Sequence, residues 1–420
     1  MRVALAYGRD GTTVEVPEGT VVITPVDEPG LPDEGAAITA ALRRPLDGPS
    51  LTALAEGAGR VVVVFPDLTR PMPNRTVLPP VLAELARAGV PDGHITLLCA
   101  TGTHRQATPA EMRELVGTDI VDRYAIVDHD GTGDGHVEVG TVDGVPVLLQ
   151  REYVEADLRV VTGFVEPHFF AGFSGGPKAV CPGLAANATI LEAHHPRRIA
   201  DARATFVTRQ GNPVHDFVRA AVALAPPHLS VDVAINRTRE VTAVFAGPLA
   251  AAHDAACAHV EAASVRTVEA PFDLVVSTNS GYPLDRNLYQ AVKGMAAAER
   301  IVRPGGVVIM AAACEDGVPE HGDFAQLLAG AATPAALLGA SGAPELDRWQ
   351  AQVLGRVLQK AEVQLHAEGL DDDRWPTPLL GRASDLDDAV AAALDRLGPA
   401  ARVAVIPEGP LTVATVRPDA

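Results

Sequence analysis

Short runs of β-branched residues alternate with Ala- and Leu-rich segments along the first part of the chain, and this alternation is typical of βαβ units. Strands joined through helices pair in parallel, so the pattern predicts a parallel sheet covered by helices. The expected elements, in order, are a first strand within 1–11, a buried strand at 60–67, a helix at 76–89, a strand at 94–104, a helix at 108–117 and a strand at 157–168.

A second set of α/β elements begins near residue 271, after a region at 246–271 that we expect to be mostly helical. The set comprises strands at 272–281 and 305–314, a helix at 288–302, and closing strands at 401–410 and 411–416. Since 420 residues are long for one domain, we predict two α/β domains with mainly parallel sheets and a cofactor and substrate cleft between them. Residues 1–268 would form the N-terminal cofactor-binding and catalytic domain, and 269–420 the C-terminal domain that closes the cleft.

Polar clusters follow three of the predicted strands directly. They are DLTRP at 67–71, TGTHR at 101–105 and EPHFFAGFSGGPK at 166–178. Because ligands of open α/β sheets bind beyond the carboxyl ends of the strands, we expect these loops to meet at one crevice.

The glycine-rich loop ending in Lys178 does not fit the phosphate-binding P-loop. That motif needs a second glycine and a terminal hydroxyl, but Pro177 and Ala179 stand at those positions. Proline also removes a backbone N–H donor. A tight turn with proline starting a helix would explain the glycines, but not a lysine flanked by His168 and His194.

The histidines form a second pattern. His104 and His168 each end a predicted strand, and His194 and His195 lie on a predicted helix that starts near Asn187. Neighbouring helical residues point about 100° apart, so only one of that pair can face a site. Two imidazoles facing one crevice could serve as base and acid on opposite faces of a substrate carbon.

Two further clusters carry charge. Asp67 and Arg70 either form a local ion pair at the turn or bind an anion, for which the planar guanidinium is well suited. Tyr289, Gln290 and Lys293 share one turn of a predicted helix. Lys293 is either a solvated surface charge or, in an interdomain cleft, a partner for a carboxylate.

Composition limits the partners. The net charge is −19 and the pI about 5.0, which argues against nucleic-acid binding. An anionic substrate would therefore need local positive charge. We expect no membrane association, because no stretch approaches the ~18–20 apolar residues that span a bilayer. Four cysteines without a CxxC pair favour a reducing, cytoplasmic setting.

Together, DLTRP, TGTHR, EPHFFAGFSGGPK, the HH pair and YQAVK resemble the nickel-dependent lactate racemase family of 2-hydroxyacid racemases and epimerases. The resemblance runs in order from about residue 8 into the C-terminal domain. Its most specific part is GFSGGPK followed sixteen residues later by His194 (194 − 178 = 16). It implies a nickel-pincer nucleotide, a thiolated nicotinic-acid mononucleotide whose ring carbon and two sulfurs hold nickel.

The resemblance also implies a role for each matching residue. Lys178 would carry the cofactor through a thioamide, and His194 would complete the coordination of nickel. The remaining roles are cofactor binding by Asp67, Leu68, Thr69 and Arg70, acid–base catalysis by His104 and His168, and substrate binding by Arg70, Tyr289, Gln290 and Lys293.

The implied reaction is a reversible hydride transfer from C2 to the pincer, with one histidine removing the hydroxyl proton and the other acting on the opposite face. The substrate would be a 2-hydroxy acid or sugar acid, and the partners would include the enzymes that make the cofactor. Two alternatives stay open: an NAD-type dehydrogenase, although no GxGxxG follows the first strand, and a non-catalytic nucleotide- or metal-binding protein.

Overall fold

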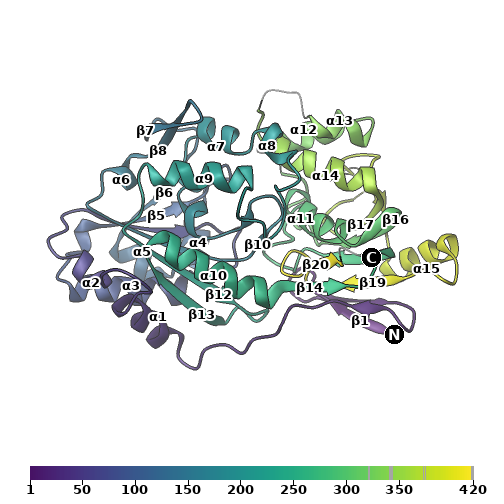
Figure 1. Cartoon of the computed structure of the whole chain (residues 1–420), viewed down its shortest axis with the longest axis horizontal. Coiled ribbons are helices and arrows are strands. Elements are labelled where there is room, and N and C mark those ends of the chain that lie inside the picture. The colour runs from purple at the N-terminus through teal and green to yellow at the C-terminus, as the bar shows by residue number, and fades with distance from the viewer. Residues whose placement is uncertain (320–321, 340–343, 372, 374, 418–420) are drawn as a thin grey trace.

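The computed structural model describes residues 1–319, 322–339, 344–371, 373 and 375–417, and within them the chain forms two six-stranded sheets (Figure 1). The first sheet has the order β13-β12-β9-β4-β5-β6 and is parallel except for β13, which is antiparallel to β12. Its strands are β4 (Val61–Pro66), β5 (Ile95–Ala100), β6 (Ala125–Asp128), β9 (Leu158–Phe164), β12 (Leu229–Ile235) and β13 (Val241–Gly247).

The order of this sheet reverses at β4. The chain first builds outward from β4 through β5 to β6, and later places β9 and β12 on the other side of β4. The loops after β4 and β9 therefore leave neighbouring strands in opposite directions, which opens a crevice at this switch point. The loop after β5 borders the same crevice from the far side of β4.

The second sheet is parallel throughout, with the order β18-β17-β16-β15-β19-β3. Its strands are β3 (Val21–Val22), β15 (Phe272–Thr278), β16 (Val302–Ala311), β17 (Ala361–His366), β18 (Gly381–Arg382) and β19 (Val403–Ile406). The shorter pairs of strands are β1 (Arg2–Leu5) with β2 (Thr12–Glu15), β7 (His136–Val142) with β8 (Val145–Gln150), β10 (Pro167–His168) with β11 (Gly172–Phe173), and β14 (Val265–Val268) with β20 (Val413–Val416).

The first strands of the chain belong with the second sheet. β3 pairs with β19, and Val3 and Leu5 of β1 are buried in one apolar cluster with Leu274 and Val276 of β15. Figure 1 accordingly places both chain ends beside the second sheet. β3 and β19 thus pair although they lie 383 residues apart in the sequence (404 − 21 = 383), while the boundary expected at residue 268 stays a prediction.

Alternation along β4 explains how the first sheet is covered on both faces. Val61, Val63 and Phe65 pack in the cluster that contains α1 and α3, whereas Val62 and Val64 pack in the cluster that contains α7 and α9. The helices of the chain are α1 (Glu34–Arg43), α2 (Leu51–Leu54), α3 (Asn74–Arg87), α4 (Pro109–Val116), α5 (Thr118–Arg123), α6 (Arg151–Val154), α7 (Asn187–Ala193), α8 (Pro196–Ile199), α9 (Pro213–Ala223), α10 (Leu249–Ser264), α11 (Leu288–Glu299), α12 (Phe324–Ala329), α13 (Pro334–Leu338), α14 (Arg348–Lys360) and α15 (Leu386–Leu397).

Region 246–271 is mostly helical, as predicted, since α10 lies between the end of β13 and β14. The structure corrects two other expected boundaries. The strand expected at 94–104 ends at Ala100, which leaves the following polar residues in a loop. The helix expected to hold both neighbouring histidines ends at Ala193, so that His194 is the C-cap of α7 and His195 is the N-cap of α8.

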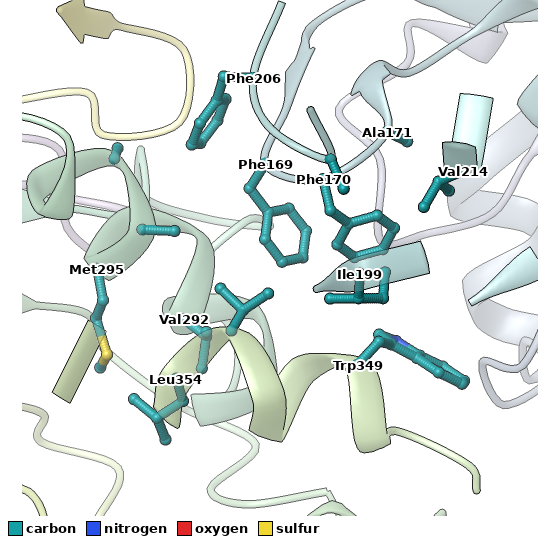
Figure 2. Packing of buried hydrophobic residues seen from close by; sticks show 14 of the residues in the cluster. Phe169, Phe170, Ala171, Ile199, Phe206, Val214, Val292, Met295, Trp349 and Leu354 are labelled. Atoms are coloured by element: carbon teal, nitrogen blue, oxygen red, sulfur yellow. The ribbon is translucent and has the colours of Figure 1, made fainter. Parts of the chain in front are cut away.

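One apolar core joins the two halves. Phe169 and Phe170, from the loop after β9, pack in a single buried cluster with Val292 of α11 and Leu354 of α14. Figure 2 shows Phe169 directed at Val292 and Phe170 beside Ile199. Among the helices described, none is long and apolar enough to cross a membrane.

Asp285 ties the N-terminal hairpin to the second half, and its loss should destabilise the protein. Its Oδ2 accepts the N–H groups of Gly8 (2.7 Å) and Ala313 (3.0 Å). Asp285→Ala would leave buried donors unpaired, so we expect the free energy of unfolding to fall by about 1–3 kcal/mol in urea denaturation. The exposed Asp10→Ala should change it by less than about 0.5 kcal/mol. Equal effects of the two substitutions would contradict the role of Asp285.

Candidate active site

Both halves of the chain line one inner pocket, of about 110 Å³, at the switch point of the first sheet. A larger outer pocket of about 500 Å³ adjoins it and shares Thr103, His104, Tyr289 and Gln290. Nine of the eleven residues predicted from the sequence line the inner pocket: Asp67, Arg70, His104, His168, Lys178, His194, Tyr289, Gln290 and Lys293. The other two, Leu68 and Thr69, line the outer pocket.

The turn after β4 holds His104 in one orientation. The buried carboxylate of Asp67 lies 2.8 Å from His104 Nδ1, and the Thr69 hydroxyl donates to Asp67 Oδ1 at 2.8 Å. Burial tends to raise the pKa of Asp67, but His104 and Arg70 outweigh it and hold that pKa below its ordinary value. The ionised carboxylate accepts the proton of Nδ1, and in the neutral form of the ring this arrangement leaves the lone pair on Nε2 of His104.

At His168 the ring nitrogen Nδ1 acts as an acceptor, whereas at His104 it faces a carboxylate and donates. Nδ1 of His168 accepts the backbone N–H of Ala171 (3.2 Å) and of Phe170 (3.5 Å) in the turn between β10 and β11. Burial, and after it the charge of Lys178, holds the pKa of His168 well below its ordinary value. The neutral ring must therefore carry its proton on Nε2. His104 and His168 thus reach the crevice from strands on either side of β4, one with a free lone pair and one with an N–H.

The loop that carries Lys178 packs closely on β9 and α10. Gly176 donates its N–H to buried Asp232 Oδ1 at 2.9 Å, and a Cβ there would lie 2.4 Å from the ring of His253. Gly175 has φ of +72°, a conformation that favours glycine. Close packing, rather than a phosphate cradle, explains these glycines. Burial, together with Arg70, lowers the pKa of Lys178 to about 7, so a large fraction of its amine is uncharged near neutral pH.

His194 presents one nitrogen to the pocket. Its Nδ1 donates to the carbonyl of Ile190 at 2.8 Å, one turn earlier in α7. Burial and the charge of Lys178 lower the pKa of His194 to about 3, so the ring is neutral and Nε2 has a free lone pair. Its neighbour His195 is not among the residues that line either pocket, and only one of the pair faces the site.

The second half contributes α11, whose first turn is capped by Asn287, which accepts the N–H of Gln290. Gln290 is buried, and its Oε1 has no hydrogen-bond partner among the described residues. Lys293 is 7% exposed, and burial together with Arg70 lowers its pKa to about 7. Tyr289 is held by Trp349, which donates from Nε1 to its hydroxyl at 2.7 Å.

Sequence reasoning missed one residue that lines this site and one that acts on its charges. Trp349 lies in the wall of the inner pocket. Glu166 lines neither the inner nor the outer pocket but is buried near the cations: burial raises its pKa, and Arg70, Lys293 and Lys178 oppose that rise. The scarcity of lysine in the sequence could have pointed to the two lysines of the site. The 34 basic residues comprise only three lysines, at 178, 293 and 360, and two of the three line the inner pocket.

The residues fit the cofactor that the sequence suggested. An uncharged lysine amine can form an amide-type bond, and a neutral imidazole nitrogen is a suitable nickel ligand. The described part of the chain contains no group of three or more His, Cys, Asp or Glu residues that could hold a metal ion. If such a cofactor were bound, Nε2 of His194 would be the nitrogen free to reach its metal.

Comparisons with known proteins agree with this architecture. The lactate racemase N-terminal domain model matches residues 7–206, and the lactate racemase C-terminal domain model matches residues 267–414. Lactate racemase of Lactiplantibacillus plantarum is 36% identical over 90% of each chain, and that of Thermoanaerobacterium thermosaccharolyticum is 35% identical over 88% of each.

Solved structures give the same result. The lactate racemase apoprotein from Thermoanaerobacterium thermosaccharolyticum superposes with a TM-score of 0.90 at 31% identity, covering 99% of this chain and all of that one. A Thermotoga maritima protein shares the fold, with a TM-score of 0.70 at 17% identity over 93% of this chain and all of that one. Fold and site therefore define a two-domain α/β isomerase of the racemase class. The chain belongs to the lactate racemase family.

The lysine environments make a direct prediction. After reductive methylation with ¹³C-formaldehyde, the resonances of Lys178 and Lys293 should titrate near pH 7, because burial beside Arg70 disfavours the charged form. Lys178→Ala and Lys293→Ala would assign the two signals. Since unfolding restores the ordinary pKa of 10.5, these lysines should make stability rise with pH between about 7 and 10.5. Midpoints near 10.5 in the folded protein would contradict the buried cationic site.

Proposed function

We propose that this chain inverts C2 of a 2-hydroxy acid with a nickel-pincer nucleotide attached to Lys178. The observation that carries the proposal is the pair His104 and His168, which reach one crevice from either side of β4 with different partners at Nδ1, beside Arg70, Lys178 and Lys293. Because the relatives are named lactate racemases, lactate is the first substrate to test.

The residues of the inner pocket suit the binding of this cofactor. The uncharged amine of Lys178 is the nucleophile that a thioamide link requires, and Nε2 of His194 is free to bind nickel. The segment Asp67–Arg70, with Leu68 and Thr69 facing the outer pocket, would bind the nucleotide portion. When bound, the cofactor supplies reversible acceptance of a hydride from C2.

The two histidines would move the hydroxyl proton. Nε2 of His104 has the lone pair needed to accept it, and the ionised Asp67 stabilises the imidazolium that results. Once C2 has regained its hydrogen from the opposite face, the oxygen of the former keto acid is an alkoxide, and Nε2–H of His168 can donate a proton to it. The proton count closes when His104 passes the proton it accepted back to His168 by way of water, and the other enantiomer reacts by the same steps in reverse.

The carboxylate of the substrate would be held by Arg70 and Lys293, and the unpaired Oε1 of Gln290 would accept a hydrogen bond from a hydroxyl of the substrate. Both cations lie in the inner pocket, although the chain as a whole carries a net charge of −19. We also propose that the protein acts in the cytoplasm, where enzymes that make the cofactor would load it.

Cofactor loading tests whether Lys178 is the residue to which the cofactor is covalently attached. In protein co-expressed with the cofactor-making enzymes, Lys178→Ala should lose the covalent adduct in intact-mass analysis, whereas His194→Ala should retain the adduct and hold nickel poorly. Lys178→Arg should also remain bare, because a guanidinium does not form the thioamide. Lys360→Ala is the matched control and should load fully. An adduct of full mass on Lys178→Ala would show that the tether lies elsewhere.

The fate of the C2 hydrogen tests the reaction. A substrate deuterated at C2 should give a product of inverted configuration that keeps its label, because no side chain that exchanges with water takes this hydrogen. His104→Ala and His168→Ala should each lower the rate by roughly 10²–10⁴-fold, without additive losses. The exposed His94→Ala serves as control. Complete loss of the label to solvent in an active preparation would indicate C2 proton abstraction instead.

A further inference from the structure

Trp349, in the first turn of α14, covers the predicted metal ligand. Its indole is 3% exposed and lies 4.7 Å from the His194 ring, centroid to centroid, with an angle of 39° between the planes. Phe170 meets the same histidine edge-on at 5.3 Å and 88°. The hydrogen bond from Nδ1 to Ile190 sets the tautomer of His194, and the two aromatic contacts limit how far its ring can tilt.

The indole is in turn held by the helix that carries the predicted substrate-binding residues. Trp349 Nε1 donates to the hydroxyl of Tyr289, and the neighbouring Gln350 donates to the backbone carbonyl of the same tyrosine. Trp349 and its neighbour are therefore both hydrogen-bonded to the first turn of α11.

The same helix also binds the corner of the chain that follows the metal ligand. Gln352 Nε2 donates to the carbonyl of Pro196 at 3.1 Å, at the start of α8. Three residues of α14, namely Trp349, Gln350 and Gln352, thus connect α11 of the second half with the His194–Pro196 corner of the first half.

We propose that Trp349 is a positioning residue for nickel: it holds the His194 ring so that Nε2 faces the metal, and it links that ring to Tyr289. The inference rests on the proposed function, because it assigns a partner to the nickel ligand. Residues that orient a metal ligand without touching the metal commonly contribute roughly 10–100-fold to metal affinity.

A direct substrate contact is the competing role, because the indole also lines the inner pocket. The two roles differ in what they affect. A substrate contact changes KM and leaves nickel retention unaltered, whereas a positioning residue changes nickel retention even when no substrate is present.

The experiment uses protein that has been loaded with cofactor by co-expression and is then exposed to a chelator in the absence of substrate. Elemental analysis follows the nickel that remains bound, and intact-mass analysis follows the covalent adduct. Trp349→Leu removes both the stacked ring and the donor, while Trp349→Phe keeps an aromatic ring over His194. Trp375→Phe is the matched control, because this second tryptophan donates to Leu380 and lines neither pocket. Thermal unfolding of each variant verifies that it folds.

We expect Trp349→Leu to release nickel roughly 10–100-fold faster than the wild type, with the adduct on Lys178 intact. Trp349→Phe should restore most of the retention, and the control should match the wild type. The proposal would be overturned if a folded Trp349→Leu released nickel at the rate of the wild type, whether or not its KM were raised. It would also be overturned if Trp349→Phe released nickel as fast as Trp349→Leu. A wild-type protein without adduct or nickel would instead refute the proposed function itself.

Discussion

The burial of positive charge where the two halves meet is the constraint on which the site depends. Arg70, Lys178 and Lys293 line one small pocket, and their mutual repulsion adds to the cost of removing each from water. Two buried carboxylates, Asp67 and Glu166, offset only part of this charge, since both lysines keep a pKa of about 7. A pocket of this kind favours anionic ligands, and a carboxylate substrate and a nucleotide phosphate both qualify.

The same cationic environment sets the proton states of the histidines. Lys178 lies close enough to His168 and His194 to help keep both rings neutral, while local hydrogen bonds decide which nitrogen holds the proton. His104 differs because an ionised carboxylate, rather than backbone N–H groups, faces its Nδ1. The Nδ1 atoms of the three histidines thus have three different kinds of partner: a carboxylate, backbone N–H groups and a backbone carbonyl.

Much of this arrangement could be predicted from the sequence. Alternating apolar runs indicated the strands, and the rule that ligands bind beyond parallel strands brought Asp67, His104 and His168 together. The specific roles of Lys178 and His194 came from resemblance to a family, because neither periodicity nor spacing distinguishes a tether from a surface lysine. The pairing of β3 with β19 could not be foreseen, since a two-residue strand has no periodicity and its partner lies about 380 residues away. Trp349 was missed for a similar reason, because it enters the site through tertiary packing alone. Glu166 belongs to a loop that the sequence singled out, but its burial beside the cations could not be foreseen.

Conversion of pure enantiomers by the cofactor-loaded enzyme is the most direct test of racemisation at C2. Separate reactions begin with the D and the L form of the same 2-hydroxy acid, and both enantiomers and the 2-keto acid are followed by chiral chromatography. Both reactions should converge on equal amounts of the two enantiomers, without net formation of keto acid. Stoichiometric accumulation of keto acid, or conversion that proceeds from one enantiomer only, would contradict a racemase that uses His104 and His168 on opposite faces of C2.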